Sequence, residues 1–232
     1  MSGIIKAILL FSSVASVSAA EAALITYVFS GSLTQVSTSA PNDDAVFEIL
    51  NGYGVTVGAQ FQGSLTVESN TADVLSDDPD RSRYMQPQTT VTLNLGGLDS
   101  DGETYVSGTL RVNNLPSTES GDLWVYSGAI ASFAPQVLTT YFDLRLTDAS
   151  GTALASDAIA PIADLGLFDP YNPANPSASG LVAALLMPDY GVVEIRGRFE
   201  SFATPIPVPA AGLLLLSGVT TLLFARRIRG DI

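Results

Sequence analysis

An alternation of apolar and polar residues is the feature that most restricts the fold of this chain. Between residues 24 and 34 every second residue is apolar or glycine, and most of the residues between them are polar. Successive side chains of a β-strand point to opposite faces, so this pattern predicts a half-buried strand. The pattern recurs in three stretches, whose inward positions are Val55, Val57, Ala59, Phe61, Gly63, Leu65 and Val67; Val106, Gly108, Leu110 and Val112; and Val193, Ile195, Gly197 and Phe199.

Each of the four stretches carries a glycine on its inward face, at Gly31, Gly63, Gly108 and Gly197. Glycine weakens the interior of a strand unless the strand bends or another group packs closely over it. We therefore expect β-bulges at these positions, or large aromatic side chains that cross over the glycines. The irregular spacing of the glycines argues against a solenoid and favours one closed sandwich.

Further strands are predicted at residues 90–95, 123–126 and 137–147, and the links between strands are rich in turn-forming residues. Many short strands with such turns indicate an all-β protein, so we predict one antiparallel β-sandwich or jelly-roll-like domain. Little helix is expected. Residues 45–51 fit a turn or two, and residues 179–187 fit either a short helix or a buried strand.

The part of the chain between Leu24 and Thr204 is strongly acidic. It holds six arginines, no lysine and 21 Asp and Glu residues, a net charge of −15, against −13 for the whole chain. Such a surface repels phosphate backbones, so nucleic acid is not an expected partner. The charge would attract divalent cations or a cationic polymer, or it serves only to keep an extracellular protein soluble.

The chain contains no cysteine and no histidine, and its one lysine is Lys6 near the N-terminus. Disulfides, thiolate or imidazole metal sites and nucleophiles activated by histidine are therefore excluded. Carboxylates, Tyr, Ser, Thr and Arg remain for catalysis. We expect a protein that is not an enzyme and has no cofactor.

Residues 1–23 have the features of a secretory signal peptide. Lys6 precedes a short apolar run at residues 7–11, and mostly small residues follow, with cleavage sites after Ala19, Ala20 or Ala22. The apolar run is too short to span a bilayer stably. The chain is therefore expected to divide into a signal peptide at 1–23, an acidic β domain at 24–204 and a C-terminal segment at 205–232.

The C-terminal segment combines prolines, an apolar run and arginines. Residues 210–225 carry no charge and would form a helix of about 24 Å, shorter than the roughly 30 Å of a bilayer's hydrocarbon core. Arg226, Arg227 and Arg229 follow and would stay in the cytoplasm. This predicts a marginal transmembrane helix, which fits both a permanent and a temporary anchor.

The order of these elements resembles a known family. A leader, an acidic β-rich body without cysteine, a proline motif, an apolar run and a basic end resemble the PEP-CTERM proteins in their VPxPA variant. The proline motif comprises Ile206, Pro207, Val208, Pro209, Ala210 and Ala211. Ile206 departs from the usual valine, and Val208 replaces the glutamate of the commonest form.

The resemblance implies sorting by an exosortase, a membrane cysteine protease of Gram-negative bacteria that make exopolysaccharide. The tail would be removed, and the protein would pass from the inner membrane to the cell surface or the extracellular matrix. The resemblance implies nothing about biochemical activity. We therefore expect a non-catalytic structural or binding body; the alternatives are a carbohydrate-binding module and a permanently anchored type I membrane protein.

Two kinds of candidate site remain in the body. Asp99, Asp101 and Glu103 alternate around a glycine, as at the start of a calcium loop, although a plain hairpin turn explains them too. Asp73, Asp77, Asp78 and Asp80 fit a cation site or a solvated loop. A sugar platform would use aromatic side chains, and the candidates are Trp124, Tyr126, Tyr141 and Tyr171.

Overall fold

The computed structural model describes residues 24–39, 43–86, 89–100, 103–105, 108–116, 118–130, 139–162, 164–172, 175, 178–187 and 191–204. The predicted signal peptide and the C-terminal segment from residue 205 onward lie outside these ranges. In chain order the elements are β1 (Leu24–Thr38), α1 (Asp43–Gly52), β2 (Gln60–Glu68), β3 (Arg81–Gln86), β4 (Thr89–Leu95), β5 (Leu98–Asp99), β6 (Glu103–Tyr105), β7 (Gly108–Asn113), β8 (Asp122–Ile130), β9 (Thr139–Asp148), the 3-10 helix η1 (Leu165–Leu167), β10 (Gly180–Met187) and β11 (Gly191–Ala203).

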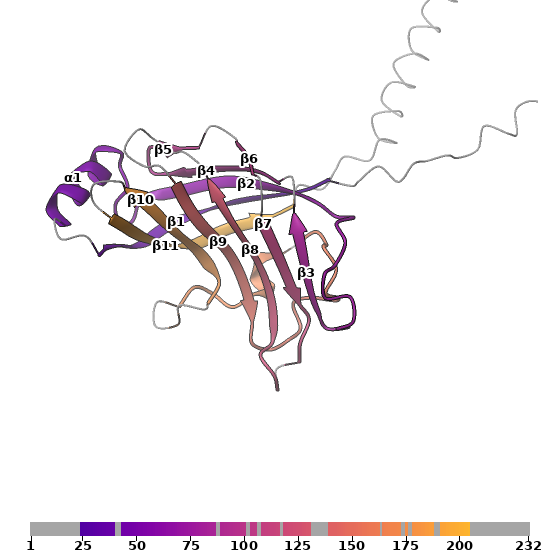
Figure 1. Ribbon diagram of the computed structural model, residues 1–232. Coiled ribbons are helices and arrows are strands. Elements are labelled where there is room, and N and C mark those ends of the chain that lie inside the picture. The colour runs from indigo at the N-terminus through magenta and orange to yellow at the C-terminus, as the bar shows by residue number, and fades with distance from the viewer. Residues whose placement is uncertain are drawn as a thin grey trace, which may run out of the picture.

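The strands form one large antiparallel sheet (Figure 1). Its order is β3-β7-β8-β9-β10-β11-β1-β2-β4-β5, and β6 pairs with β4 beside β5. The prediction of an all-β protein with little helix is confirmed at this level. Among the described residues, no helix is both long enough and apolar enough to cross a membrane.

The sheet curls around its own core. The ring of Tyr27 in β1 lies 5.0 Å from that of Trp124 in β8, and Phe202 in β11 lies 5.3 Å from Trp124. Three strands separate β8 from β1 in the sheet, so these contacts cross the core between its two halves. All three side chains are at most 1% exposed.

Most of the predicted inward positions are buried, but Val57 is an exception. Its side chain is 65% exposed, because residues 53–59 form turns and β2 begins only at Gln60. Residues 180–187, which the sequence left open between helix and strand, form β10. The helical turn expected at residues 45–51 is the longer helix α1, which buries Val46 and Leu50.

Two bulges interrupt the pairing between β1 and β11. Ser30 pairs with Ser201 and Gly31 with Phe199, so Glu200 is an extra residue in β11. The second bulge inserts Thr34 into β1. The sequence pattern places the inward residues of β11 at positions 193, 195, 197 and 199. Because Glu200 is an extra residue, the next inward side chain is that of Phe202 and not that of Ser201.

Aromatic rings cover the inward glycines, as the sequence predicted. Phe29 pairs with Gly63 and Phe61 with Gly31 across β1 and β2, and each ring lies over the glycine opposite. A Cβ atom at Gly63 would lie 2.6 Å from Cζ of Phe29, and one at Gly197 would lie 2.5 Å from Cε1 of Phe61. The glycines therefore make the space that the rings fill.

This packing predicts an energetic coupling between Gly197 and Phe61. Gly197→Ala should cost about 2 kcal/mol of unfolding free energy, because the new methyl group overlaps the Phe61 ring and otherwise meets only the Ser32 carbonyl at 3.3 Å. In a Phe61→Leu background the cost of Gly197→Ala should fall by at least about 1 kcal/mol. A double-mutant cycle by urea unfolding measures this difference, and additive effects would contradict it.

The first and the last described strands are neighbours in the middle of the sheet, and the start of the one lies beside the end of the other. Val28 near the start of β1 pairs with Ala203 at the end of β11. The backbone N–H and the hydroxyl of Thr204 each donate a hydrogen bond to the Ile162 carbonyl, both at 3.2 Å. The last described residue is therefore fixed to the body of the fold.

Candidate functional site

The structure locates only part of the predicted sites. The sorting motif at residues 206–211, the arginines at 226, 227 and 229, and Asp101 lie outside the described residues. Asp99 is exposed at the end of β5 and accepts a hydrogen bond from the Asn94 amide. Glu103 begins β6, and its side chain is not described. The calcium loop stays a prediction; within the described ranges no group of three or more acidic residues could hold a metal ion.

The four candidate aromatic residues have different environments. Trp124 and Tyr126 are 1% and 0% exposed and belong to the core, so neither can form a sugar platform on the surface. Tyr141 is 61% exposed on β9. Tyr171 is half-buried and lines a cavity of about 700 Å³ together with Phe199, Arg198 and Glu200.

The carboxylate of Asp73 stabilises a loop. It accepts hydrogen bonds from the backbone N–H groups of Leu75 and Arg83 and from the hydroxyl of Ser82, at 2.8–3.0 Å. Burial raises the pKa of Asp73, but these hydrogen bonds outweigh that effect and hold the pKa below its ordinary value. Asp78 likewise accepts from the backbone N–H of Asp80 at 3.1 Å. These contacts favour a solvated loop over a cation site as the interpretation of the acidic residues at positions 73, 77, 78 and 80.

Asp148 is the most extensively hydrogen-bonded carboxylate of the described residues. Only 4% exposed, it accepts from the hydroxyl of Ser150 and from the backbone N–H groups of Ser150, Thr152 and Ala153, at 2.6–2.9 Å. Burial raises the pKa of Asp148, but the hydrogen bonds outweigh this and lower the pKa to about 2. A carboxylate with so low a pKa stays ionised at neutral pH and holds the turn after β9.

The low pKa of Asp148 predicts a loss of stability in acid. Because its pKa falls from 3.8 to about 2 on folding, the carboxylate stabilises the fold above about pH 4 by about 2 kcal/mol, and this contribution disappears between about pH 4 and pH 2. Asp148→Asn should therefore cost about 2 kcal/mol at pH 7 and progressively less below pH 4. Urea unfolding at pH 7 and pH 3 measures both values.

Asp143→Asn is the control for that experiment. Asp143 lies 3.6 Å from Arg145 in a partly exposed ion pair, and such pairs contribute no more than about 1 kcal/mol. An Asp148→Asn protein as stable as wild type at pH 7 would contradict the role given to Asp148.

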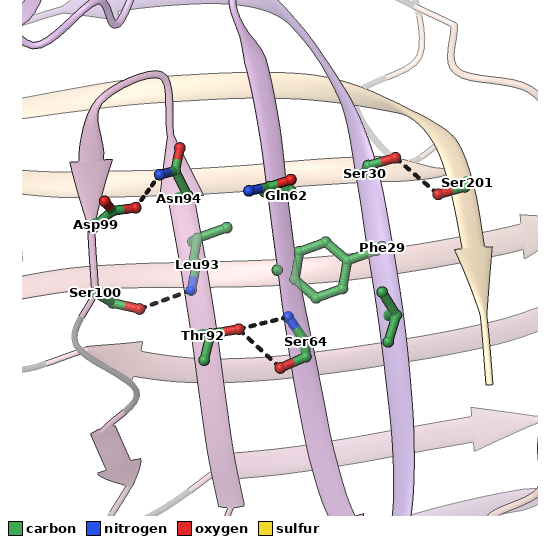
Figure 2. A pocket seen from close by; sticks show the side chains of 12 residues that line it. Phe29, Ser30, Gln62, Ser64, Thr92, Leu93, Asn94, Asp99, Ser100 and Ser201 are labelled. Carbon is green, nitrogen blue, oxygen red and sulfur yellow. Dashed lines mark hydrogen bonds between the residues drawn. The ribbon is translucent and has the colours of Figure 1, made fainter. Parts of the chain in front are cut away.

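A groove on the outer face of the sheet brings together polar side chains from five strands. Its volume is about 400 Å³, and it crosses β11, β1, β2, β4 and β5 (Figure 2). Directly paired residues form one straight row across it, here called the polar row, which consists of Ser201, Ser30, Gln62, Asn94 and Asp99. Beside this row, Ser64 pairs with Thr92, and their hydroxyls lie 2.8 Å apart. We call the groove with these seven side chains the polar trough.

The polar row follows from the alternation in the strands. Phe29, Phe61 and Leu93 point into the core, so the residues next to them point outward. Ser30, Gln62 and Asn94 therefore lie at predicted outward positions. Ser201 faces outward because of the bulge at Glu200, and Asp99 lies in a strand, β5, that the alternation does not predict. The sequence did not show that these positions line up, because the register between strands cannot be read from alternation alone.

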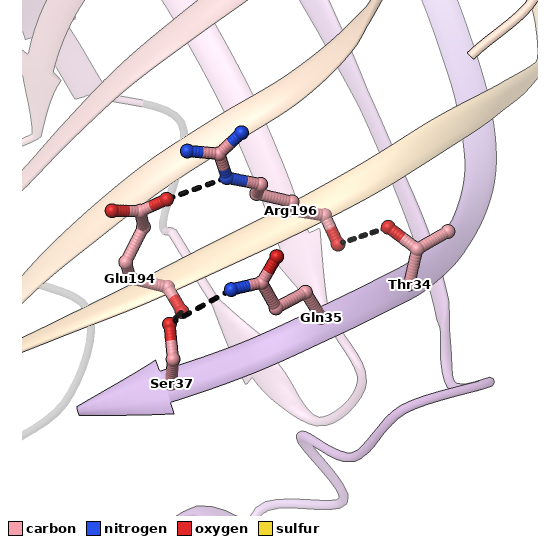
Figure 3. Close-up of polar contacts among 5 residues, drawn as sticks. All are labelled: Thr34, Gln35, Ser37, Glu194 and Arg196. Carbon is pink, nitrogen blue, oxygen red and sulfur yellow. Dashed lines mark hydrogen bonds and ion pairs between the residues drawn. The ribbon is translucent and has the colours of Figure 1, made fainter. Parts of the chain in front are cut away.

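A second group of polar residues lies at the bulge of β1, and its side chains are engaged in contacts within the protein. Figure 3 shows that Thr34 donates to the Arg196 carbonyl at 3.1 Å and Ser37 to the Glu194 carbonyl at 3.4 Å. Gln35 donates to the Ser37 hydroxyl at 3.3 Å, and Arg196 pairs with Glu194 at 2.5 Å. Each of the five side chains thus makes a contact within the protein, and these contacts hold the bulge.

No family model, curated protein or solved structure matches this chain.

Proposed function

We propose that the chain is an exported protein of a Gram-negative bacterium, sorted through its C-terminal tail by an exosortase-like protease. Its β domain is a non-catalytic body with a structural or binding role at the cell surface or in the extracellular matrix. In this proposal the curled sheet is a β-sandwich of the jelly-roll type. Residues 1–23 direct export, and residues 210–225 hold the chain in the membrane until the tail is cut.

One structural observation supports the proposal best. The antiparallel pairing of β1 with β11 brings Val28 next to Ala203, so the junctions with the leader and with the tail lie at the same side of the body. Thr204 is bound to Ile162 directly before the proline motif. A protease can therefore act on the tail without opening the core.

The absence of histidine and cysteine from the whole chain supports the non-catalytic role. The carboxylates Asp73 and Asp148, which have lowered pKa values, hold loops. Carbohydrate binding is the second candidate function. The polar trough favours it, since hydroxyl and amide side chains suit a hydroxyl-rich ligand.

Cell fractionation tests the proposed export. Antibodies against the β domain should find the protein in the inner membrane and then at the cell surface, and Pro207→Ala/Pro209→Ala should trap it in the membrane. A substitution in the β domain outside the polar trough, Gln35→Ala, serves as the control and should leave the distribution unchanged. Full-length protein that stays soluble in the cytoplasm would overturn the proposal.

A further inference from the structure

We propose that the polar trough binds an uncharged polysaccharide, whose chain runs along the polar row from β11 to β5. The inference deepens the proposed function. It rests on that function only for the location, the cell surface or the extracellular matrix, in which the protein meets the polysaccharide. It assigns the binding role of the body to residues that are different from the aromatic candidates.

The first argument is the length and straightness of the row. Its five members are direct neighbours on five adjacent strands, and four interstrand spacings of about 4.8 Å give a length of about 19 Å. That length accommodates a short run of sugar units in an extended chain. Figure 2 shows the row along one line, with the Thr92 and Ser64 side chains beside it.

The second argument is the hydrogen-bonding capacity that remains. The hydroxyls of Ser30 and Ser201 lie 2.8 Å apart, and only one of them can donate to the other, so one O–H and several lone pairs still face outward. At the centre of the row, the amide of Gln62 has no hydrogen-bond partner among the described residues and is exposed. The row thus offers both donors and acceptors to the hydroxyl groups of a sugar.

The third argument is charge. The body carries a net charge of −15, yet the trough contains one carboxylate, Asp99, and its Oδ1 already accepts from Asn94. None of its lining residues is a cation that could hold a phosphate, sulfate or uronate group. The acidic surface around it repels anionic polymers. With one engaged carboxylate and no cation among its lining residues, the trough suits an uncharged ligand, and gels with cationic chitosan test the alternative that the acidic surface alone attracts a polymer.

The fourth argument is rigidity and an apolar contact. The side chains stand on paired strands, so the backbone that carries them is already ordered before a ligand binds. Val28 lines the trough and is 45% exposed, which offers an apolar surface to the C–H face of a sugar ring. The polar row, the hydroxyls of Ser64 and Thr92 and this side chain make a preformed surface of mixed character, as in other ligand sites.

Affinity electrophoresis tests the proposal. The full chain, purified in a mild detergent, is run in native gels that contain dextran, hydroxyethyl cellulose or galactomannan, and in gels with anionic alginate or cationic chitosan. We expect at least one uncharged polymer to retard the wild-type protein. Gln62→Ala/Asn94→Ala should weaken that binding at least about tenfold, because two hydrogen-bonding side chains are lost.

Gln35→Ala is the matched control, since Gln35 is an exposed glutamine of β1 outside the trough. It should change the affinity by less than about twofold. The single variant Gln62→Ala, at an exposed position, keeps the test valid if the double variant does not fold, and it should weaken binding at least about threefold.

Three results would overturn the proposal: no retardation by any uncharged polymer, unchanged affinity of the folded trough variants, or retardation by alginate or chitosan alone. Each leaves the proposed export intact, because fractionation and tail processing are measured without any glycan. Conversely, a cell-surface protein could keep its tail and bind an uncharged polymer in a way that requires Gln62. That result would refute the proposed sorting and support the proposed binding site in the polar trough.

Discussion

Gly31→Val should leave the chain largely unfolded under conditions in which the wild-type protein is folded. A Cβ atom at this position would overlap the carbonyl oxygen of Arg198 and lie 2.6 Å from Cζ of Phe61. The carbonyl belongs to the neighbouring strand β11 and cannot move aside as the end of a flexible side chain can. We expect a loss of at least about 3 kcal/mol, out of the 5–15 kcal/mol typical of a domain.

Urea unfolding of the purified chain measures this loss. Trp124 is the only tryptophan of the chain and is 1% exposed in the core, so its fluorescence reports unfolding of the sheet. Gly52→Ala is the control: a Cβ atom there meets nothing within 4 Å, and the change should be neutral or stabilise by up to about 1 kcal/mol. Equal urea midpoints for Gly31→Val and wild type would show that the close approach of β1 and β11 is absent.

Removal of residues 205–232 should separate folding from sorting. The truncated protein should keep the wild-type urea midpoint to within about 0.5 kcal/mol, because Thr204 and its bonds to Ile162 remain. It should no longer be held in the membrane fraction, because the predicted hydrophobic helix and the arginines are gone. Unfolding curves and fractionation of the same protein test both outcomes.

A longer truncation, after Phe199, is the matched control. It removes Phe202, which is 1% exposed and packs on the rings of Tyr27 and Trp124. Loss of such a side chain costs about 3–5 kcal/mol, so this protein should not fold stably. If removal of residues 205–232 alone destabilised the domain to the same degree, the tail would be part of the fold, and the proposed division at Thr204 would be wrong.

Alternation predicted the inward faces of most strands well, because one face of each strand packs on the core. It failed at Val57, where apolar residues keep the period through a turn. It could not distinguish helix from strand for β10, because outward residues such as Leu186 are apolar as well and hide the period of two. The bulge at Glu200 was also invisible, since its position depends on the pairing with β1.

The local sequence pattern predicted only part of the packing around the inward glycines. From the cost of a glycine within a strand, the sequence predicted either bulges at these positions or aromatic rings that cover them. It did not predict that Phe61 serves two glycines, Gly31 and Gly197, on different strands. The polar row shows the same limit. Ser30, Gln62 and Asn94 could be assigned to outward faces, but the outward position of Ser201 depends on the bulge at Glu200, and the alignment of the row is a property of the whole sheet.

The central claim is that this chain is an exported, tail-sorted surface protein, and the intact mass of its cell-surface form tests that claim most directly. The account predicts a mass without the leader, cut after Ala19, Ala20 or Ala22, and without the stretch from Arg226 to Ile232. Cells that lack the exosortase-like protease should instead accumulate a membrane-bound form that keeps this stretch. A surface form from normal cells that retains Arg226–Ile232 would contradict the account.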